Sequence, residues 1–127
     1  MLITKLEDLE VYTISFQLAK EIKELIYKIP HYWTIGEASQ ILRSSSSVPA
    51  NIAEGFGQRF YVKKLIAYLN NALGSSDETQ NHLRKLNGDG YITDKDANDF
   101  LKRYKNLSVK ILNWINYLKK KHQVILS

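Results

Sequence analysis

Hydrophobic side chains recur every three or four residues through four long stretches of the chain. In the first stretch, residues 8–29, one apolar face consists of Val11, Ser15, Leu18, Ile22, Leu25 and Ile29. Charged residues occupy the opposite side, which is the pattern of an amphipathic helix. Pro30 follows directly and restricts the backbone of the residue before it, so the helix is predicted to end there.

The second stretch, residues 37–57, keeps the same rhythm across a proline. Its predicted inner face consists of Ala38, Ile41, Ser45, Val48, Ile52 and Phe56. Proline inside a helix removes one backbone hydrogen bond and crowds the preceding turn, at a cost of about 3 kcal/mol. The sequence therefore allows one helix kinked at Pro49 or two short helices, and the unbroken rhythm favours the kinked helix. The serines at positions 44–47 offer hydroxyls for the carbonyl that proline leaves without a donor.

Two more helices are predicted over residues 62–86 and 94–121. Their inner faces consist of Leu65, Leu69, Leu73, Ser76, Leu83 and Leu86 in the first, and of Ala97, Leu101, Tyr104, Leu107, Ile111, Ile115 and Leu118 in the second. The small residues at positions 74–76 are expected to let another helix approach closely. The sequence of residues 87–90, Asn-Gly-Asp-Gly, predicts a turn, and residues 93–96 are close to a capping box. Four helices joined by short links predict one all-α domain over residues 1–127, an antiparallel up-down-up-down four-helix bundle.

Composition narrows the classes of protein that fit. A length of 127 residues suits a single domain, and the absence of cysteine excludes disulfides and thiolate metal sites. Acidic residues interrupt the N-terminal stretch where a secretory signal would be apolar, and no run approaches about 18 uncharged apolar residues. We therefore expect a cytoplasmic protein with no membrane partner. The net charge of +5 is compatible with nucleic-acid binding without requiring it.

The motifs that resemble metal or catalytic sites are each incomplete. If Gly90 is aligned with the glycine of an EF-hand loop, residues 87, 89, 91 and 93 fall at ligand positions. The two ends of the loop do not match, because Lys85 occupies the first ligand position, which requires a carboxylate, and Asp96 replaces the glutamate at the last. A glycine turn followed by a helix cap explains the same residues. The three histidines, His31, His82 and His122, lie on separate segments, and the serine run has no base at helical spacing. We expect no catalytic residue, no metal site and no cofactor.

A strip of polar residues follows one face of the second predicted helix. Arg43, Ser47, Asn51 and Glu54 are spaced four, four and three residues apart, and Ser75 and Glu78 lie opposite them on an antiparallel neighbour. The strip is either a structural polar network or a binding site, and we favour the structural network.

Basic residues form groups near the predicted helix ends. Arg59, Lys63 and Lys64 flank the second link, Arg84 and Lys85 precede the third, and a further group lies at positions 102, 103 and 105. Each group is able to contact phosphates, which would make binding depend on salt concentration. For any single residue, a solvated helix surface is the simpler interpretation.

Residues 40–83 carry the motif of a known family. Gln40-Ile-Leu-Arg43, followed after three residues by Ser47-Val-Pro-Ala-Asn-Ile-Ala-Glu-Gly55 and by Arg59, resembles the bacterial four-helix bundle proteins first noticed as reading frames inside intervening sequences of 23S ribosomal RNA genes. The downstream Leu69, Ala72, Gly74, Ser75, Glu78 and Leu83 and the sequence Gly90-Tyr91-Ile92 fit the same pattern. The resemblance covers residues 8–120.

The resemblance implies an antiparallel four-helix bundle, a ring-shaped homopentamer and no enzymatic activity. A related branch is the accessory protein of diversity-generating retroelements, a basic pentamer that works with a reverse transcriptase and its RNA. Arg43, Asn51, Glu54 and Arg59 match motif residues whose role in the family is not settled.

The chain departs from the family pattern at three positions. Tyr61 replaces a serine cap, Lys64 replaces an acidic residue, and Gln80 replaces a second glutamate. The start of the third helix is thus more apolar and more basic than in the family. Contiguous apolar side chains are rare on monomer surfaces, so residues 60–62 (Phe60, Tyr61 and Val62) are predicted to form a subunit contact.

The leading hypothesis is a non-enzymatic homo-oligomer, a pentamer, that binds RNA or DNA, or a nucleic-acid-associated protein, through a basic surface. Its candidate residues are Arg43, Arg59, Lys63, Lys64, Arg84 and Lys85. The alternative is a structural or protein-interaction module with no nucleic-acid role.

Overall fold

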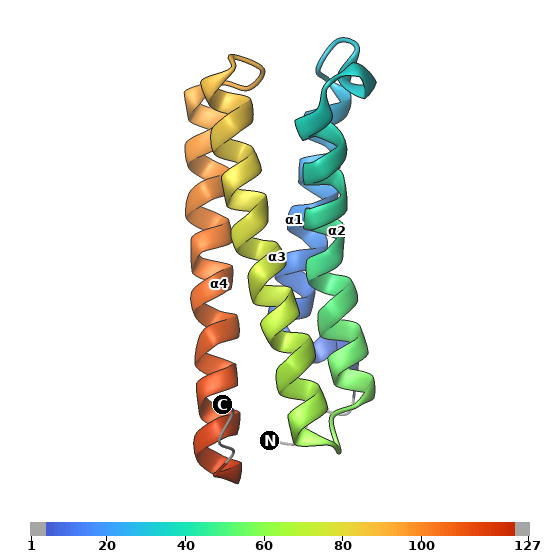
Figure 1. The fold of residues 1–127 in the computed structure, drawn as a ribbon, viewed down its shortest axis with the longest axis vertical. Helices are drawn as coiled ribbons and strands as arrows, with labels where there is room; N and C mark the ends of the chain where they lie inside the picture. Colours follow the sequence, from blue (N-terminus) through green and yellow to red (C-terminus); the bar gives the residue numbers. More distant parts are fainter. Residues whose placement is uncertain (1–4, 124–127) are drawn as a thin grey trace.

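A computed structural model describes residues 5–123, which form four long helices (Figure 1). They are α1 (Glu10–Tyr27), α2 (Gly36–Gly57), α3 (Val62–Gly88) and α4 (Asp94–His122), with short 3-10 turns η1 (Leu6–Asp8) and η2 (Tyr32–Thr34) before α1 and α2. Within this described part there is no β-strand. None of its helices is both long and apolar enough to cross a bilayer. The prediction of an all-α four-helix bundle is confirmed.

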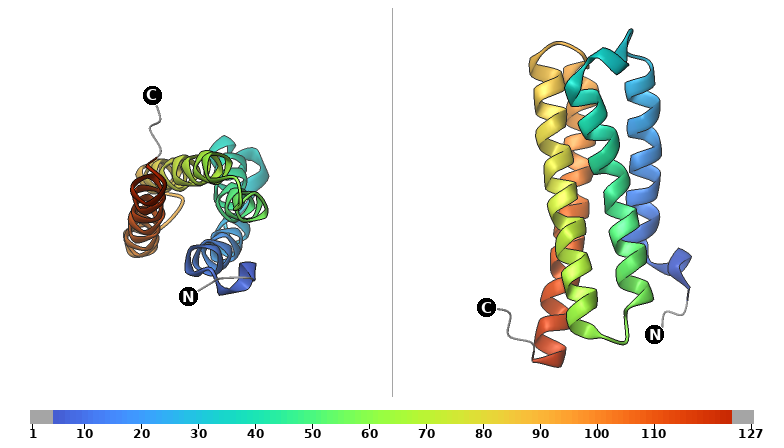
Figure 2. Two further views of the ribbon diagram at one scale, coloured as in Figure 1. Left: turned by 90° about the horizontal axis from the view of Figure 1, so that it is seen from below. Right: turned by 45° about the vertical axis from the view of Figure 1, so that its right-hand side comes forward.

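Side-chain bonds between helices show that neighbours run in opposite directions. Along α2 from Glu37 to Ser47, the bonded partners on α3 run backwards from His82 to Ser75. Between α1 and α4, Glu10 pairs with Lys110 and Glu21 with Arg103, so these two helices also run in opposite directions. Seen from one end, the helices stand in the order α1, α2, α3, α4 (Figure 2). Because α1 and α4 approach one another much less closely than successive helices do, this side of the bundle is the most open.

The predicted apolar faces meet in one core. Leu18, Ile22, Ile41, Ile52, Leu69 and Ile111 are among its fully buried side chains. Leu25, Leu73 and Leu101, predicted to lie inside, are only partly buried at its edge, and Ile26 and Phe100 are buried beside them. The core thus follows the three-to-four-residue rhythm closely, with small rotations of each helix.

The first helix is shorter than the apolar pattern suggests. Leu9 has an extended backbone, so α1 begins at Glu10, and it ends at Tyr27 before the proline at position 30. Leu9 and Ile29 nevertheless remain buried beyond the two ends. The apolar face continues past the helix because the flanking turns fold back onto the core. His31 then reverses the chain with a φ of 56°, in the left-handed region.

Pro49 lies inside a single helix, α2, so the interpretation as two short helices is wrong. Pro49 leaves the carbonyl of Ser45 without its helical donor. The serine hydroxyls were predicted to bond this carbonyl, but they do not. The hydroxyl of Ser44 instead donates to the carbonyl of Ile41 and that of Ser45 to the carbonyl of Leu42, one turn earlier. Burial of Pro49 and its neighbour Val48 against the other helices offsets the lost bond.

The close approach between helices occurs at a different glycine from the one predicted. A Cβ atom on Gly55 would lie 3.1 Å from the Cβ of Tyr68 and 3.2 Å from a methyl of Leu65, so a larger residue here would push α2 and α3 slightly apart. Gly74, by contrast, has nothing within 4 Å of its Cβ position. Of the small residues beside it, Ser76 is the one fully buried, against α4.

One polar group lies in the core without a partner. Tyr104 is fully buried, and its phenolic oxygen is the one buried side-chain oxygen or nitrogen in residues 5–123 that has no hydrogen-bond partner. Burial raises the pKa of Tyr104 well above its ordinary value. The side chain therefore contributes its ring to the core while its hydroxyl opposes burial.

Candidate nucleic-acid interface

A chain of ionic contacts joins the upper halves of α2 and α3. Arg43 donates to a carboxylate oxygen of Glu78. The His82 ring lies between two carboxylates: its Nε2 is 3.3 Å from Glu78, and its Nδ1 contacts Glu37. Lys85 lies 3.6 Å from the second carboxylate oxygen of Glu37. The two carboxylates match the charges of Arg43 and Lys85, so most of the charge here is compensated within the chain.

Hydroxyl and amide groups continue this line toward the middle of the bundle. The amide of Asn51 donates to the Ser47 hydroxyl at 2.9 Å, and the Ser75 hydroxyl donates to the same oxygen at 3.0 Å. One turn away, the hydroxyls of Ser44 and Thr79 lie 2.8 Å apart in the core. These groups satisfy one another between the two helices.

The polar network predicted from the sequence thus falls into two bonded groups. Arg43 pairs with Glu78, and Ser47 joins the asparagine of α2 to Ser75 of α3. Glu54, the remaining member, is exposed and makes no hydrogen bond with the described side chains. Sequence reasoning missed Glu37, His82 and Thr79, although Thr79 and His82 continue the spacing of Ser75 and Glu78 along α3.

A second polar cluster lies on the other side of α3, where it faces α4. The hydroxyl of Ser108 is 2.7 Å from that of Ser76 and donates to the carboxylate of Asp77 at 2.9 Å. The amide of Gln80 donates to the same Ser108 oxygen at 3.2 Å. The amide of Gln80 serves here as a donor that a carboxylate would lack. The predicted apolar face of α4 passes beside Ser108, so its spacing gave no signal for this cluster.

Ion pairs bridge α1 and α4 on the open side of the bundle. Arg103 binds both carboxylate oxygens of Glu21 and lies 3.3 Å from Asp99. The hydrogen bonds from Arg103 lower the pKa of Glu21 more than partial burial raises it. Nearer the other end, Lys110 bonds to Glu10 at 2.8 Å. Polar pairs therefore replace much of the apolar contact between these two helices.

The glycine turn before α4 is organised as a helix cap. The amide of Asn87 donates to the carbonyl of Ile92 and to the carboxylate of Asp94, and Gly90 has a φ of 83°. The hydroxyl of Thr93 accepts from the backbone nitrogen of Asp96, as the capping interpretation predicts. In residues 5–123, no three side chains of the metal-binding kind come together.

The six predicted nucleic-acid-binding residues lie in two places. Arg59 and the lysines at 63 and 64 are at the end of the bundle where α2 joins α3 (Figure 1). Arg84 and Lys85 lie some twenty residues further along α3, which corresponds to about 30 Å of helix. Arg43 and Lys85 are held by carboxylates, as described above. The residues therefore do not form one continuous patch on a single chain, and the group at the α2–α3 junction is the less compensated of the two.

The junction between α2 and α3 concentrates uncompensated positive charge. The guanidinium of Arg59 lies 4.2 Å from the ring centroid of Phe56 and 4.7 Å from that of Phe60, and it donates to the Phe56 carbonyl. Lys63 and Lys64 are exposed in the first turn of α3, which holds no acidic residue and whose N-cap, Tyr61, makes no side-chain capping bond. None of the three cations makes an ion pair with residues of the described range. Free helical N–H groups add to the positive potential.

A groove opens beside this junction, on the open side between α1 and α4. We call it the terminal groove; its volume is about 540 Å³, and its polar and aromatic lining includes Glu10, Phe56, Arg59, Lys110, Asn113, Trp114, Tyr117 and Lys121. The residues from α4 at positions 110, 114, 117 and 121 share one strip at spacings of four, three and four. Sequence analysis missed them, although two aromatic residues flanked by two lysines at helical spacing were the available signal.

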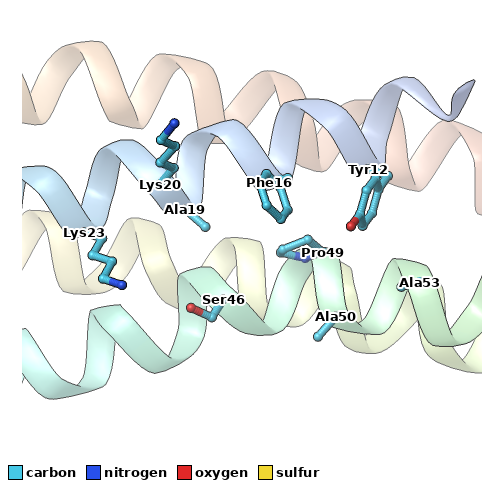
Figure 3. Close-up of a pocket in the computed structure, with 9 residues that line it drawn as sticks. All are labelled: Tyr12, Phe16, Ala19, Lys20, Lys23, Ser46, Pro49, Ala50 and Ala53. Atoms are coloured by element: carbon cyan, nitrogen blue, oxygen red, sulfur yellow. The ribbon is translucent and has the colours of Figure 1, made fainter. Parts of the chain in front are cut away.

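A shallow apolar groove follows α1 and α2 on another face. It is lined by Tyr12 and Phe16 from α1 and by Pro49, Ala50 and Ala53 from α2, with a volume of about 640 Å³ (Figure 3). The Phe16 ring is 56% exposed. At the predicted subunit contact, Phe60 is 84% and Tyr61 64% exposed, while Val62 is only partly exposed. The chain therefore exposes aromatic side chains in both places.

Comparison with known proteins places this arrangement in a family. The sequence matches the family described as 23S rRNA-intervening sequence protein over residues 7–113. The chain belongs to this family. A crystal structure of a protein of unknown function from the S23 ribosomal protein family of Bacteroides thetaiotaomicron is similar, with 27% identity and a TM-score of 0.77 over 84% of this chain and 95% of that chain. No curated protein matches the sequence.

Family membership gives the motif residues a structural context. Arg43 bonds across to Glu78 of α3, Asn51 bonds to Ser47 within α2, and Gly55 permits the close approach of α2 and α3. Arg59 instead lies within 5 Å of the ring centroids of Phe56 and Phe60 and lines the terminal groove. The motif therefore combines positions that build the helix pair with one that faces solvent.

Proposed function

We propose that this family protein is a non-enzymatic homo-oligomer that binds RNA through the basic junction between α2 and α3. The observation that carries the proposal is the group formed by Arg59, Lys63 and Lys64 at a helix N-terminus without acidic residues or ion-pair partners in the described part of the chain. Such a group attracts phosphates through both its side chains and its backbone. The family description, 23S rRNA-intervening sequence protein, refers to a gene location, whereas the solved neighbour's assignment to a ribosomal protein family supports RNA as the partner.

A filter-binding titration at two ionic strengths tests this function. The double variant Lys63→Glu/Lys64→Glu should bind a structured ribosomal RNA fragment more weakly and with a smaller dependence on salt, because fewer counterions are released. The matched control is Lys28→Glu/Lys95→Glu, which makes the same charge change at exposed positions outside the basic groups and should leave binding unchanged. Equal affinities and slopes for wild type and the first variant would remove the junction from the proposal.

The apolar α1–α2 groove favours a second role, contact with another copy of the chain. We propose a pentamer in which this groove or residues 60–62 form the subunit contact. An aspartate at position 16 (Phe16→Asp) or at position 60 (Phe60→Asp) should lower the molar mass measured by light scattering after gel filtration, whereas Val109→Asp, at a half-exposed site of α4, should not. A monomeric wild type would refute the oligomer and leave RNA binding to be judged by the titration.

A further inference from the structure

The terminal groove combines flat ring surfaces with unpaired positive charge. Tyr117 is 56% exposed, and the ammonium of Lys121 lies 5.6 Å from the centroid of its ring. Trp114 lies one turn before Tyr117 on the same strip of α4 and also lines the groove. On the opposite wall, the guanidinium of Arg59 lies 4.2 Å from the ring centroid of Phe56 and 4.7 Å from that of Phe60, so two rings restrict its position before any ligand binds.

The charges at this groove are arranged for an anionic occupant. Arg59 and Lys121 make no ion pair with the described residues, and the single lining carboxylate, Glu10, is already bound to Lys110. A second copy of this chain, with its own net charge of +5, would bring like charge to a groove of this kind. An acidic peptide would match the charge but offers no planar groups for the rings.

Resting on the proposed function, we propose that the terminal groove binds a single-stranded segment of nucleic acid, with unpaired bases stacked on Tyr117 and Trp114. Lys121 and Arg59 would meet the neighbouring phosphates. Stacking on aromatic rings tolerates every base, and a volume of about 540 Å³ lies in the range of small-ligand sites. Bases inside a duplex are stacked on one another, so a duplex does not offer these faces.

The chain provides a direct reporter for this site. It has two tryptophans, Trp114 in the groove and Trp33, which is 71% exposed in η2 at the other end of the bundle. In Trp33→Phe, the fluorescence of Trp114 should be quenched by oligouridine RNA and by oligothymidine DNA of about ten nucleotides. In Trp114→Phe, the fluorescence of Trp33 should not change. Quenching of both tryptophans, or of neither, would overturn the proposal.

Affinity measurements provide the second arm. Tyr117→Ala should weaken single-strand binding about 5- to 150-fold, the range for loss of one stacked base, for RNA and DNA alike. The control Tyr91→Ala, at a tyrosine 45% exposed in the turn before α4, should leave it unchanged. Equal binding of a blunt duplex, effective competition by polyglutamate, or an unchanged Tyr117→Ala affinity would contradict stacking in the groove.

These outcomes separate the two proposals. If the Lys63→Glu/Lys64→Glu variant loses RNA binding while Trp114 is never quenched, the basic junction stands and the stacking site fails. If Trp114 is quenched while the Lys63→Glu/Lys64→Glu variant binds structured RNA normally, the stacking site stands and the basic junction fails. If no nucleic acid binds, both proposals fail.

Discussion

The buried phenol of Tyr104 leads to a specific prediction about stability. The residue is fully buried, and its hydroxyl has no hydrogen-bond partner in the described part of the chain. Leaving such a group desolvated and unpaired costs about 1–3 kcal/mol. Tyr104→Phe keeps the ring and removes the hydroxyl, so we expect it to raise the free energy of unfolding by about 1 kcal/mol and the melting temperature by about 3–5 °C.

The same substitution has a pH signature with a defined sign. Burial raises the pKa of Tyr104 above its ordinary value of 10.0, so above that pH the unfolded phenol loses its proton while the folded phenol keeps it. The folded state then holds more protons, and wild-type stability falls as pH rises, by up to about 1.4 kcal/mol per pH unit from this group. The stability gap between Tyr104→Phe and wild type should therefore widen above pH 10.

Urea denaturation followed by circular dichroism at pH 7, 9 and about 10.5, at one fixed protein concentration, measures both effects. Tyr117→Phe is the matched control because it removes the same hydroxyl from a side chain that is 56% exposed. A Tyr104→Phe protein that is less stable than wild type, or a gap that stays constant with pH, would show that the buried hydroxyl has a partner.

Three further stability predictions rest on particular contacts. Gly74→Ala should stabilise by about 1 kcal/mol, since the site is open and alanine favours a helix. Gly55→Ala should be less stable than Gly74→Ala by about 1–3 kcal/mol, because the new Cβ at position 55 would crowd the Cβ of Tyr68. Equal urea midpoints for the two variants would refute the close approach. The hydrogen bonds from Arg103 lower the pKa of Glu21, so their stabilisation is present above pH 4.5 and is lost as pH falls. Between pH 7 and 3, wild type should lose about 0.5 kcal/mol more than Glu21→Gln in the same assay, and parallel curves would contradict this.

Some elements of the fold were readable from the chain alone because they depend on local spacing. Apolar residues at intervals of three and four define one face of a helix wherever that helix lies, so the four helices and most of the core followed directly. The continuous rhythm across Pro49 correctly indicated one helix rather than two. The cap at Thr93 was also local, since its partner is three residues away.

Contacts between helices were less predictable, because they depend on which residues face one another. The spacing of Arg43 and Ser47 placed them on one strip and suggested their partners on α3, but no pattern paired Glu37 with His82 or Ser76 with Ser108. Those pairs are set by the rotation of each helix about its axis and by the register between neighbours. A shift of one residue would separate them without changing the apolar rhythm.

The amino-acid sequence by itself determined the helices, their inner faces, the net positive charge and the family motif, since each is written in the order of residues. Only the tertiary structure decided that Gly55 rather than Gly74 is where a neighbouring helix comes close. It also decided that Arg59 lines the same groove as Trp114 and Tyr117, although more than fifty residues of chain separate them. The physical reason is that packing four helices fixes which surfaces are filled. Where α1 and α4 stay apart, side chains from both ends of the sequence meet around a groove that no local pattern describes.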